Sequence, residues 1–421
     1  MIHTRWIVYL WPVFAATCTF NPETGCQSSL QKSLMRVDQA LDRYVQEKRV
    51  AGVVALVWRD GKPIYERATG WSDREAAIPM RMDSIFRIAS MTKAMASAAA
   101  LMLAEEKKLG FHEKVSKYIP EFEKQQVLAK DPLTGAISLG PVTTEMTIHH
   151  LLTHTSGLSY ASEPELAEIY RAEGLGPALG ANWNLSGLKE EICETSAKLG
   201  KLPLAGQPGG PWLYGYSTDV LGCIIEQASK MKLDEFFRKR IIEPLGMKDT
   251  HFFMPQQDVP RLTALYGTNK DGIAERSGGN KAYPYAEGYR KSFSAGAGLV
   301  STAGDYAKFL EMIRRGGELN GKRLLKPETV KLMTYSTGGA GAPTPSGFTY
   351  GFEIAAHPGV SGESAVQSYG WIGAYGTFYR VDPRQKLVIV LMTQLAPNGT
   401  DIRDRFWQAL YDALAEAKAL Y

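Results

Sequence analysis

The chain has 421 residues, of which 44% are hydrophobic and 22% are charged, a balance that fits a globular protein with one large domain or two packed lobes. A net charge of +4 is small for this length, and no basic run is interleaved with aromatic residues, so nucleic acid is not expected as a partner. No internal apolar run reaches transmembrane length, and no membrane span is expected. The four cysteines predict no disulfide framework and no zinc site: Cys18 and Cys26 lie near the N-terminus, and Cys193 and Cys223 stand alone.

Residues 1–29 are predicted to be a signal or a disordered segment. An apolar stretch from Trp6 to Ala16 follows His3 and Arg5, as in a short secretory signal. The protein is therefore expected to be periplasmic or secreted if this segment is a signal, and cytoplasmic otherwise. An N-terminal helix or a mis-started segment is the alternative.

The first elements are predicted to be a helix and a hairpin. Residues 30–49 carry apolar side chains at helical spacing and predict an amphipathic helix. Two β-rich runs follow, at 51–58 and 63–70, and the turn between them contains Asp60 and Gly61. Such a turn between two runs of this kind predicts a β-hairpin.

Ser90 and Lys93 place a hydroxyl and an amine three residues apart at the start of an alanine-rich helical run. Positions i and i+3 share a face of a helix, so the two side chains can meet. The helix N-terminus offers backbone N–H groups to a developing oxyanion, and apolar surroundings favour a neutral amine that can take a proton. An N-capping serine followed by a solvated lysine is the alternative for this short motif.

Residues 95 to about 290 are predicted to be mostly helical, with long loops. Tyr214 and Tyr216 lie between a Gly/Pro-rich approach and a helical run that begins near Val220. A phenolate held near Lys93 could share the role of general base. Aromatic packing is the alternative for both tyrosines.

The segment from Ser368 to Gly376 contains glycines that allow a backbone to approach a ligand closely at a strand edge. A strand N–H in this position is a natural second donor of an oxyanion hole, while a bulge with aromatic packing is the alternative. A second hairpin is predicted over 376–392 and a closing helix over 401–419.

Other chemistries find little support in the sequence. His150 and His154 are spaced i, i+4, but the glutamate of a zinc-protease helix is missing and a Thr-Ser-Gly loop signal follows. No G-x-S-x-G, P-loop or dinucleotide motif is present. We expect neither a metal nor another cofactor.

The β-rich ends bracket a helical middle, which predicts an α+β fold with an antiparallel sheet flanked by helices and an inserted, mostly helical lobe. The expected sheet domain is discontinuous and comprises residues 30–94 and 297–421. The expected helical lobe comprises residues 95–296.

Five blocks along the chain resemble, in order, those of the serine β-lactamase and penicillin-binding-protein superfamily, in particular its class C-like branch. The resemblance extends from about residue 35 to 415, and the fold expected from it agrees with the one above. The blocks are Phe86–Lys93, Leu151–Leu158, Glu243–Met247, Gly296–Thr302 and Leu319–Lys322.

Two departures make the chain look like a family VIII carboxylesterase. The chain has no Lys-Thr-Gly, and Trp371-Ile372-Gly373 stands in its place; Tyr216, rather than an asparagine, follows two residues after Tyr214. The resemblance implies that Ser90 is the nucleophile and that Lys93 and Tyr214 form the base pair, with Tyr216 in reserve. It also implies an oxyanion hole from the backbone N–H groups of Ser90 and Ala374, and substrate contacts from Trp371, Gly373 and Tyr216.

The expected activity is hydrolysis of short- to medium-chain acyl esters through an acyl-Ser90 intermediate. A tryptophan in place of the lysine offers an apolar wall that suits neutral esters, so β-lactams are expected to react more slowly. The expected partner is a small-molecule ester or β-lactam, and the sequence predicts no oligomeric state. The alternatives are a class C-type β-lactamase or D-Ala-D-Ala peptidase, an acyltransferase, and a penicillin-binding sensor module without turnover.

Overall fold

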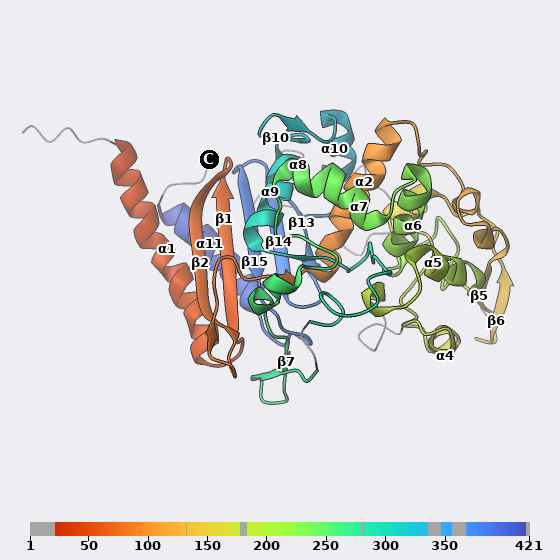
Figure 1. Cartoon of the computed structure of the whole chain (residues 1–421), viewed down its shortest axis with the longest axis horizontal. Coiled ribbons are helices and arrows are strands. Elements are labelled where there is room, and N and C mark those ends of the chain that lie inside the picture. Colours follow the sequence, from red (N-terminus) through yellow and green to blue (C-terminus); the bar gives the residue numbers. More distant parts are fainter. Residues whose placement is uncertain are drawn as a thin grey trace, which may run out of the picture.

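A seven-stranded antiparallel sheet joins the two ends of the chain (Figure 1). The computed structural model describes residues 22–131, 133–176, 183–279, 282–335, 347–355 and 368–417. The strand order is β12-β13-β14-β15-β1-β2-β3, so the N-terminal and C-terminal hairpins meet where β1 pairs with β15. The strands are β1 (Gly52–Arg59), β2 (Lys62–Asp73), β3 (Ile78–Pro79), β12 (Glu353–Ala355), β13 (Ser368–Gly373), β14 (Thr377–Asp382) and β15 (Leu387–Met392).

Helices cover both faces of this sheet, because β1 and β15 are apolar on both faces. Helices α1 (Pro22–Gln46) and α11 (Ile402–Glu416) lie side by side and pack against one face, where Leu41 and Phe406 meet Val53 and Ile389 in one core cluster. Helices α2 (Thr92–Glu105) and α9 (Ala303–Arg314) pack against the opposite face.

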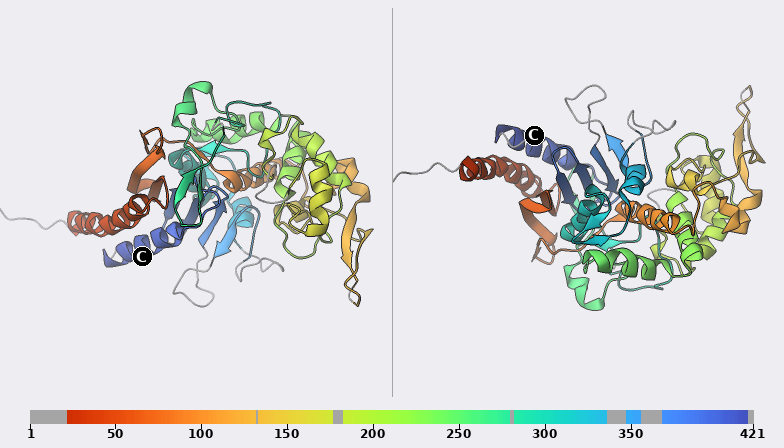
Figure 2. Two further views of the ribbon diagram at one scale, coloured as in Figure 1. Left: turned by 90° about the horizontal axis from the view of Figure 1, so that it is seen from below. Right: turned by 90° about the horizontal axis from the view of Figure 1, so that it is seen from above.

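The chain between α2 and α9 forms most of the part of the molecule that lies away from the terminal helices, as Figures 1 and 2 show. A short β-hairpin, β5–β6, extends from its far end. The remaining elements are β4 (Phe86–Arg87), η1 (Ala89–Met91), η2 (Val115–Lys117), η3 (Pro120–Lys124), β5 (Gln126–Lys130), β6 (Ile137–Pro141), α3 (Ile148–Leu152), α4 (Pro164–Ala172), η4 (Leu185–Gly187), α5 (Ile192–Lys201), α6 (Ser217–Ser229), α7 (Leu233–Phe237), η5 (Arg238–Ile242), α8 (Glu243–Leu245), η6 (Gln256–Arg261), β7 (Tyr266–Thr268), β8 (Ala274–Arg276), β9 (Val300–Ser301), β10 (Glu318–Leu319), β11 (Lys322–Arg323) and α10 (Pro327–Thr334).

The α+β fold, both hairpins and the closing helix agree with the sequence predictions. The first helix was placed too late, because α1 begins at Pro22 and so includes the end of the segment 1–29. The apolar stretch Trp6–Ala16 lies outside the described residues. The boundaries of the two expected domains remain a prediction.

The prediction that Cys193 and Cys223 stand alone was wrong. The two cysteines form a disulfide with an S–S distance of 2.10 Å that joins α5 to α6. Thirty residues separate them in sequence, and only the packing of the two helices brings them together.

None of the helices in the described part of the chain is long and apolar enough to cross a membrane.

Candidate active site

Ser90 lies on a tightly held turn between the short strand β4 and helix α2. Its side chain is largely buried, with 6% relative exposure. The residue before it, Ala89, has a φ of +43°, a left-handed conformation that costs free energy for any residue other than glycine. The carbonyl of the residue after it, Met91, accepts a hydrogen bond of 2.7 Å from the Tyr306 hydroxyl. These contacts hold the serine at a defined position at the start of α2.

Lys93 is 1% exposed and uses its amine for three short contacts. The Nζ atom lies 3.2 Å from Ser90 Oγ, 3.1 Å from the Tyr160 hydroxyl and 2.8 Å from the Gly296 carbonyl oxygen. The spacing of three residues thus brings serine and lysine together, as expected. The Gly296 carbonyl can only accept a hydrogen bond, whereas the two hydroxyls can accept or donate. A proton can therefore pass between Ser90 and Lys93 while the other contacts persist.

Tyr160 is a site residue that the sequence analysis missed. It follows the Leu151–Leu158 block by two residues and is buried between the rings of Tyr214 and Tyr216. Burial raises the pKa of the Tyr160 hydroxyl well above its ordinary value, and the neighbouring Tyr214 adds to this effect. Tyr160 therefore stays a neutral phenol beside Lys93. Its position directly after a block shared with the superfamily was the one signal available.

Tyr214 lies against Lys93 through its ring, whose centroid is 4.6 Å from Nζ. Its hydroxyl accepts a hydrogen bond of 3.1 Å from the indole N–H of Trp371. Tyr216 differs, because its side chain has no exposed surface and its hydroxyl accepts a hydrogen bond of 2.8 Å from Gly176 N–H. The structure therefore argues against Tyr216 both as a substrate contact and as the reserve catalytic tyrosine.

Four partly exposed rings form what we call the aromatic wall: Trp212, Tyr214, Phe348 and Trp371. The shortest distance between ring centroids in this set is 5.0 Å, between Phe348 and Trp371. The wall includes Tyr214, whose ring covers Lys93. It therefore forms an apolar, neutral surface beside the serine and lysine.

His154 lies behind this wall, with its ring 5.0 Å from that of Tyr214. Burial lowers the pKa of His154 to about 3, and the charge of Lys93 acts in the same direction. The imidazole is therefore neutral. Among the described residues, no group of three or more His, Cys, Asp or Glu side chains could hold a metal ion.

Strand β13 brings its last residues against the nucleophile turn. β12 pairs with it only at residues 368–370, so Trp371 to Gly373 extend beyond that pairing. A Cβ atom at Gly373 would lie 2.5 Å from the carbonyl oxygen of Ile88, two residues before Ser90. Only glycine permits this approach. Ala374, the next residue, thus follows a direct backbone contact with the turn that carries Ser90.

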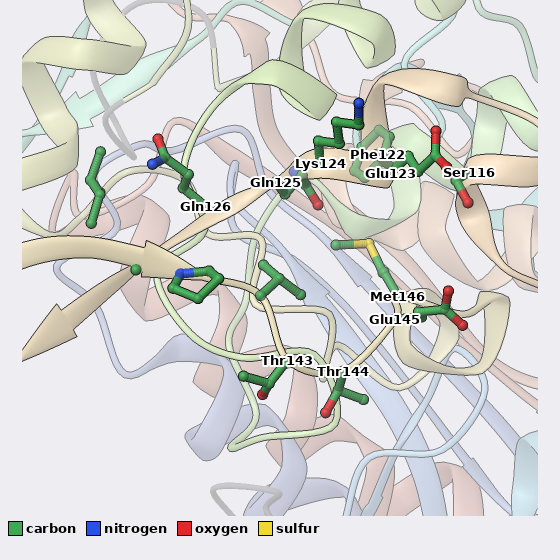
Figure 3. A pocket seen from close by; sticks show the side chains of 14 residues that line it. Ser116, Phe122, Glu123, Lys124, Gln125, Gln126, Thr143, Thr144, Glu145 and Met146 are labelled. Atoms are coloured by element: carbon green, nitrogen blue, oxygen red, sulfur yellow. The ribbon is translucent and has the colours of Figure 1, made fainter.

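A separate cavity of about 490 Å³ lies at the far end of the molecule, beside the β5–β6 hairpin. Figure 3 shows its mixed polar lining, which includes Glu123, Lys124 and Glu145. None of Ser90, Lys93 and the residues of the aromatic wall lines it. We therefore assign the candidate active site to Ser90 and its neighbours.

The chain is similar to known proteins along most of its length. The family described as Beta-lactamase matches residues 37–413. Esterase EstB of Burkholderia gladioli is 31% identical over 384 residues, which cover 86% of this chain and 91% of EstB. A methylbutanoyltransferase of Penicillium citrinum, which acts on ML-236A carboxylate, is 30% identical over 70% of this chain and 68% of its own length.

The solved structure of EstCE1, described as a hydrolase with promiscuous acyltransferase activity, superposes with a TM-score of 0.73. The match covers 92% of this chain and 99% of EstCE1, at 28% sequence identity. EstCE1 therefore has the same fold as this chain, and the family match places that fold among the β-lactamases. The chain belongs to the beta-lactamase family, in which it is a serine ester hydrolase of the family VIII esterase type.

Proposed function

We propose that the protein hydrolyses short- to medium-chain acyl esters of neutral alcohols through an acyl-Ser90 intermediate. The observation that carries this proposal is the neutral aromatic wall beside the hydrogen-bonded Ser90 and Lys93. Apolar rings gain free energy by covering an alkyl or aryl group, and they offer no counter-charge to a carboxylate. A neutral ester therefore fits this site better than an anionic substrate does.

Acylation begins when Ser90 Oγ attacks the ester carbonyl carbon and its proton passes to Lys93 Nζ. The N–H groups of Ser90 and Ala374 receive the oxyanion, and the contact of Gly373 with Ile88 supports this assignment. Collapse of the tetrahedral intermediate breaks the bond between carbon and the alcohol oxygen, which leaves with the proton from Lys93. Water then attacks the acyl-enzyme, and its proton returns to Ser90 Oγ through the same group.

We assign different roles to the two tyrosines at Lys93. Tyr214 is the partner of the base, because its partly exposed hydroxyl is held by the Trp371 N–H and its ring lies against Lys93 Nζ. Tyr160 orients the amine through its 3.1 Å contact and remains protonated. Trp371 acts both as a substrate wall and as the donor that holds Tyr214.

Steady-state hydrolysis of p-nitrophenyl butyrate and of nitrocefin, by the wild type and by Ser90→Ala, tests the proposal. We expect strong turnover of the ester and weak turnover of the cephalosporin, both lost in the variant. A preference for nitrocefin would instead establish a class C-type β-lactamase, and a stoichiometric burst without turnover would establish a penicillin-binding module. Wild-type activity in Ser90→Ala would refute the assignment of the nucleophile.

Acyl transfer to an alcohol is a second candidate activity. It is favoured by the similarity to the methylbutanoyltransferase and to EstCE1. The test is product analysis of p-nitrophenyl butyrate turnover in the presence of a primary alcohol. A butyrate ester as the main product at low alcohol concentration would make this the principal activity, and butyric acid would support hydrolysis.

We also propose that the protein works in an oxidising compartment, the periplasm or the cell exterior. Disulfides such as Cys193–Cys223 persist in such compartments and are rare in the cytosol. Cell fractionation of the producing organism, followed by thiol labelling of the purified protein, tests this proposal. Recovery from the cytosol with both thiols reduced would contradict it.

A further inference from the structure

A buried carboxylate, Asp219, is linked to the amine of Lys93 through a single residue, Gly296. Asp219, in the first turn of α6, is 1% exposed. Its Oδ1 accepts hydrogen bonds from the Ser294 hydroxyl, at 2.7 Å, and from the backbone N–H of Gly296, at 3.1 Å. The carbonyl of the same Gly296 accepts the 2.8 Å hydrogen bond from Lys93 Nζ. Asp219 thus binds the backbone N–H of Gly296, and Lys93 binds the carbonyl oxygen of the same residue.

This arrangement requires glycine at position 296. A Cβ atom there would lie 2.4 Å from Asp219 Oδ2, closer than side-chain atoms approach one another in proteins. Oδ2 itself receives no hydrogen bond from the described residues. Hydrogen bonds to Oδ1 therefore orient the carboxylate, while Oδ2 faces Gly296, which lies between Asp219 and Lys93. A buried carboxylate with an unused oxygen is costly unless a positive charge lies near it.

Among the surrounding groups, Lys93 is the one that can supply this positive charge, when its amine takes up a proton. Burial raises the pKa of Asp219, and the charge of Lys93 acts against this rise, so the two groups interact. The other titratable groups that face them come from different elements and are neutral near pH 7. Burial raises the pKa values of Tyr160 and Tyr216 and lowers that of His154. The ring of Tyr214 covers the remaining side of the amine.

We propose that Asp219 is a positioning residue that fixes the Gly296 carbonyl on Lys93 and balances the ammonium charge that forms there when Ser90 reacts. The inference rests on the proposed function for its catalytic meaning. When Ser90 Oγ bonds to the acyl carbon, its proton moves to Lys93 Nζ, and the negative charge of Asp219 stabilises the resulting ammonium. When the alcohol leaves, it takes this proton, and the amine is neutral again.

The test uses Asp219→Asn, which keeps an oxygen acceptor for Ser294 and Gly296 but removes the charge. The readout is the rate at which a fluorophosphonate probe labels Ser90, measured from pH 5 to 10. In this reaction Oγ bonds to phosphorus, fluoride leaves and Lys93 takes the hydroxyl proton, so no ester substrate is needed. Without the negative charge, Lys93 releases its proton more readily and the neutral amine persists to lower pH. We therefore expect the acidic limb of the rate profile to move down by about one pH unit, and the maximal rate to fall about tenfold.

Asp305→Asn is the matched control. Asp305 is also buried and lies in the first turn of α9, where its carboxylate accepts hydrogen bonds from the Asp249 N–H and from Lys308 Nζ; it is not among the groups bonded to Lys93. We expect this variant to lose stability while its pH profile stays that of the wild type. An unchanged acidic limb in a folded Asp219→Asn protein, or an equal shift in the control, would overturn the proposal.

If Asp219→Asn does not fold, Ser294→Ala decides instead. This change removes one hydrogen bond to Asp219 Oδ1 and keeps the charge of the carboxylate. Labelling of Ser90 should therefore slow severalfold, while the acidic limb of the rate profile stays at its wild-type pH. Wild-type rates in Ser294→Ala would contradict a role for an oriented carboxylate. Hydrolysis of p-nitrophenyl butyrate by the wild type is measured in parallel. If Ser90 is labelled but no ester is turned over, the proposed function fails, while the labelling series still decides the role of Asp219.

Discussion

The two sides of the candidate active site are built from different interactions. On the polar side, Ser90, Lys93, Tyr160 and Asp219 are all buried and are joined by hydrogen bonds. The opposite side is the aromatic wall, whose rings are partly exposed and contact one another mainly through their faces and edges. Hydrogen bonds fix the positions of reacting atoms, whereas ring contacts fix the shape of a surface. The polar side should therefore determine whether the reaction occurs, and the wall should determine which substrate reacts.

The strongest test of this division is Lys93→Ala. This change removes the amine that lies within hydrogen-bonding distance of Ser90 Oγ and takes its proton, so kcat for p-nitrophenyl butyrate should fall by about a thousandfold or more. Lys114→Ala is the control, because Lys114 is exposed and pairs with the surface residue Glu145. Activity of Lys93→Ala within tenfold of the wild type would show that the polar side does not determine whether the reaction occurs.

Two phenylalanine variants test the tyrosines at which the polar side meets the aromatic wall. Tyr214→Phe removes the hydroxyl that accepts from Trp371 and should lower kcat about a hundredfold, if this hydroxyl exchanges protons with the reacting groups. Tyr160→Phe removes only an orienting contact to Lys93 and should lower kcat about tenfold. Steady-state kinetics of both proteins decide the order. The reverse order would move the proton-transfer role to Tyr160.

The wall itself is tested by Trp371→Lys, which restores a cation in a position where the β-lactamase branch has one. We expect kcat/KM for nitrocefin relative to p-nitrophenyl butyrate to rise about tenfold, because the ammonium attracts the substrate carboxylate. Ile372→Lys is the control, since the neighbouring side chain on a strand points to the opposite face and Ile372 is 44% exposed. Equal ratios for both lysine variants would mean that the wall does not select the substrate.

The smallest effect on activity is expected from Cys193→Ser. The disulfide closes a loop of about 30 residues between α5 and α6, so its loss should lower the free energy of unfolding by about 2–4 kcal/mol. Activity at 25 °C should change little, because Cys223 lies one turn beyond Asp219 on α6 and is bonded to Cys193 rather than to Ser90 or Lys93. Denaturant unfolding with and without a reducing agent measures the effect. A wild type that is insensitive to reduction would show that the bond does not stabilise the lobe.

The sequence predicted local features of the polar side better than distant ones. The spacing of Ser90 and Lys93 follows from helical geometry, and both hairpins follow from turn residues between apolar runs. Asp219 and Gly296 are 77 positions apart, and no local pattern joins them. Cys193 and Cys223 were missed for the same reason.

Tyr214 and Tyr216 show a different limit. They are two residues apart at the start of α6, and sequence alone offers no reason to prefer one of them for the site. Packing decides, because Tyr216 is enclosed and bonded to Gly176, while Tyr214 faces Lys93 and Trp371. The resemblance to family VIII esterases, rather than the spacing, pointed to Tyr214.

The order of strands in the sheet has a consequence for how the protein is made. β1 receives its first neighbour, β2, almost at once, but its second neighbour, β15, begins only at Leu387. During synthesis this apolar strand has an open edge until nearly the whole chain has left the ribosome, which exposes it to aggregation and to chaperones. The turn that carries Ser90 gains its contact with Gly373 only slightly earlier, when β13 has been made. Nascent chains that stop before β15 should therefore be unable to hydrolyse esters, even though they contain both Ser90 and Lys93.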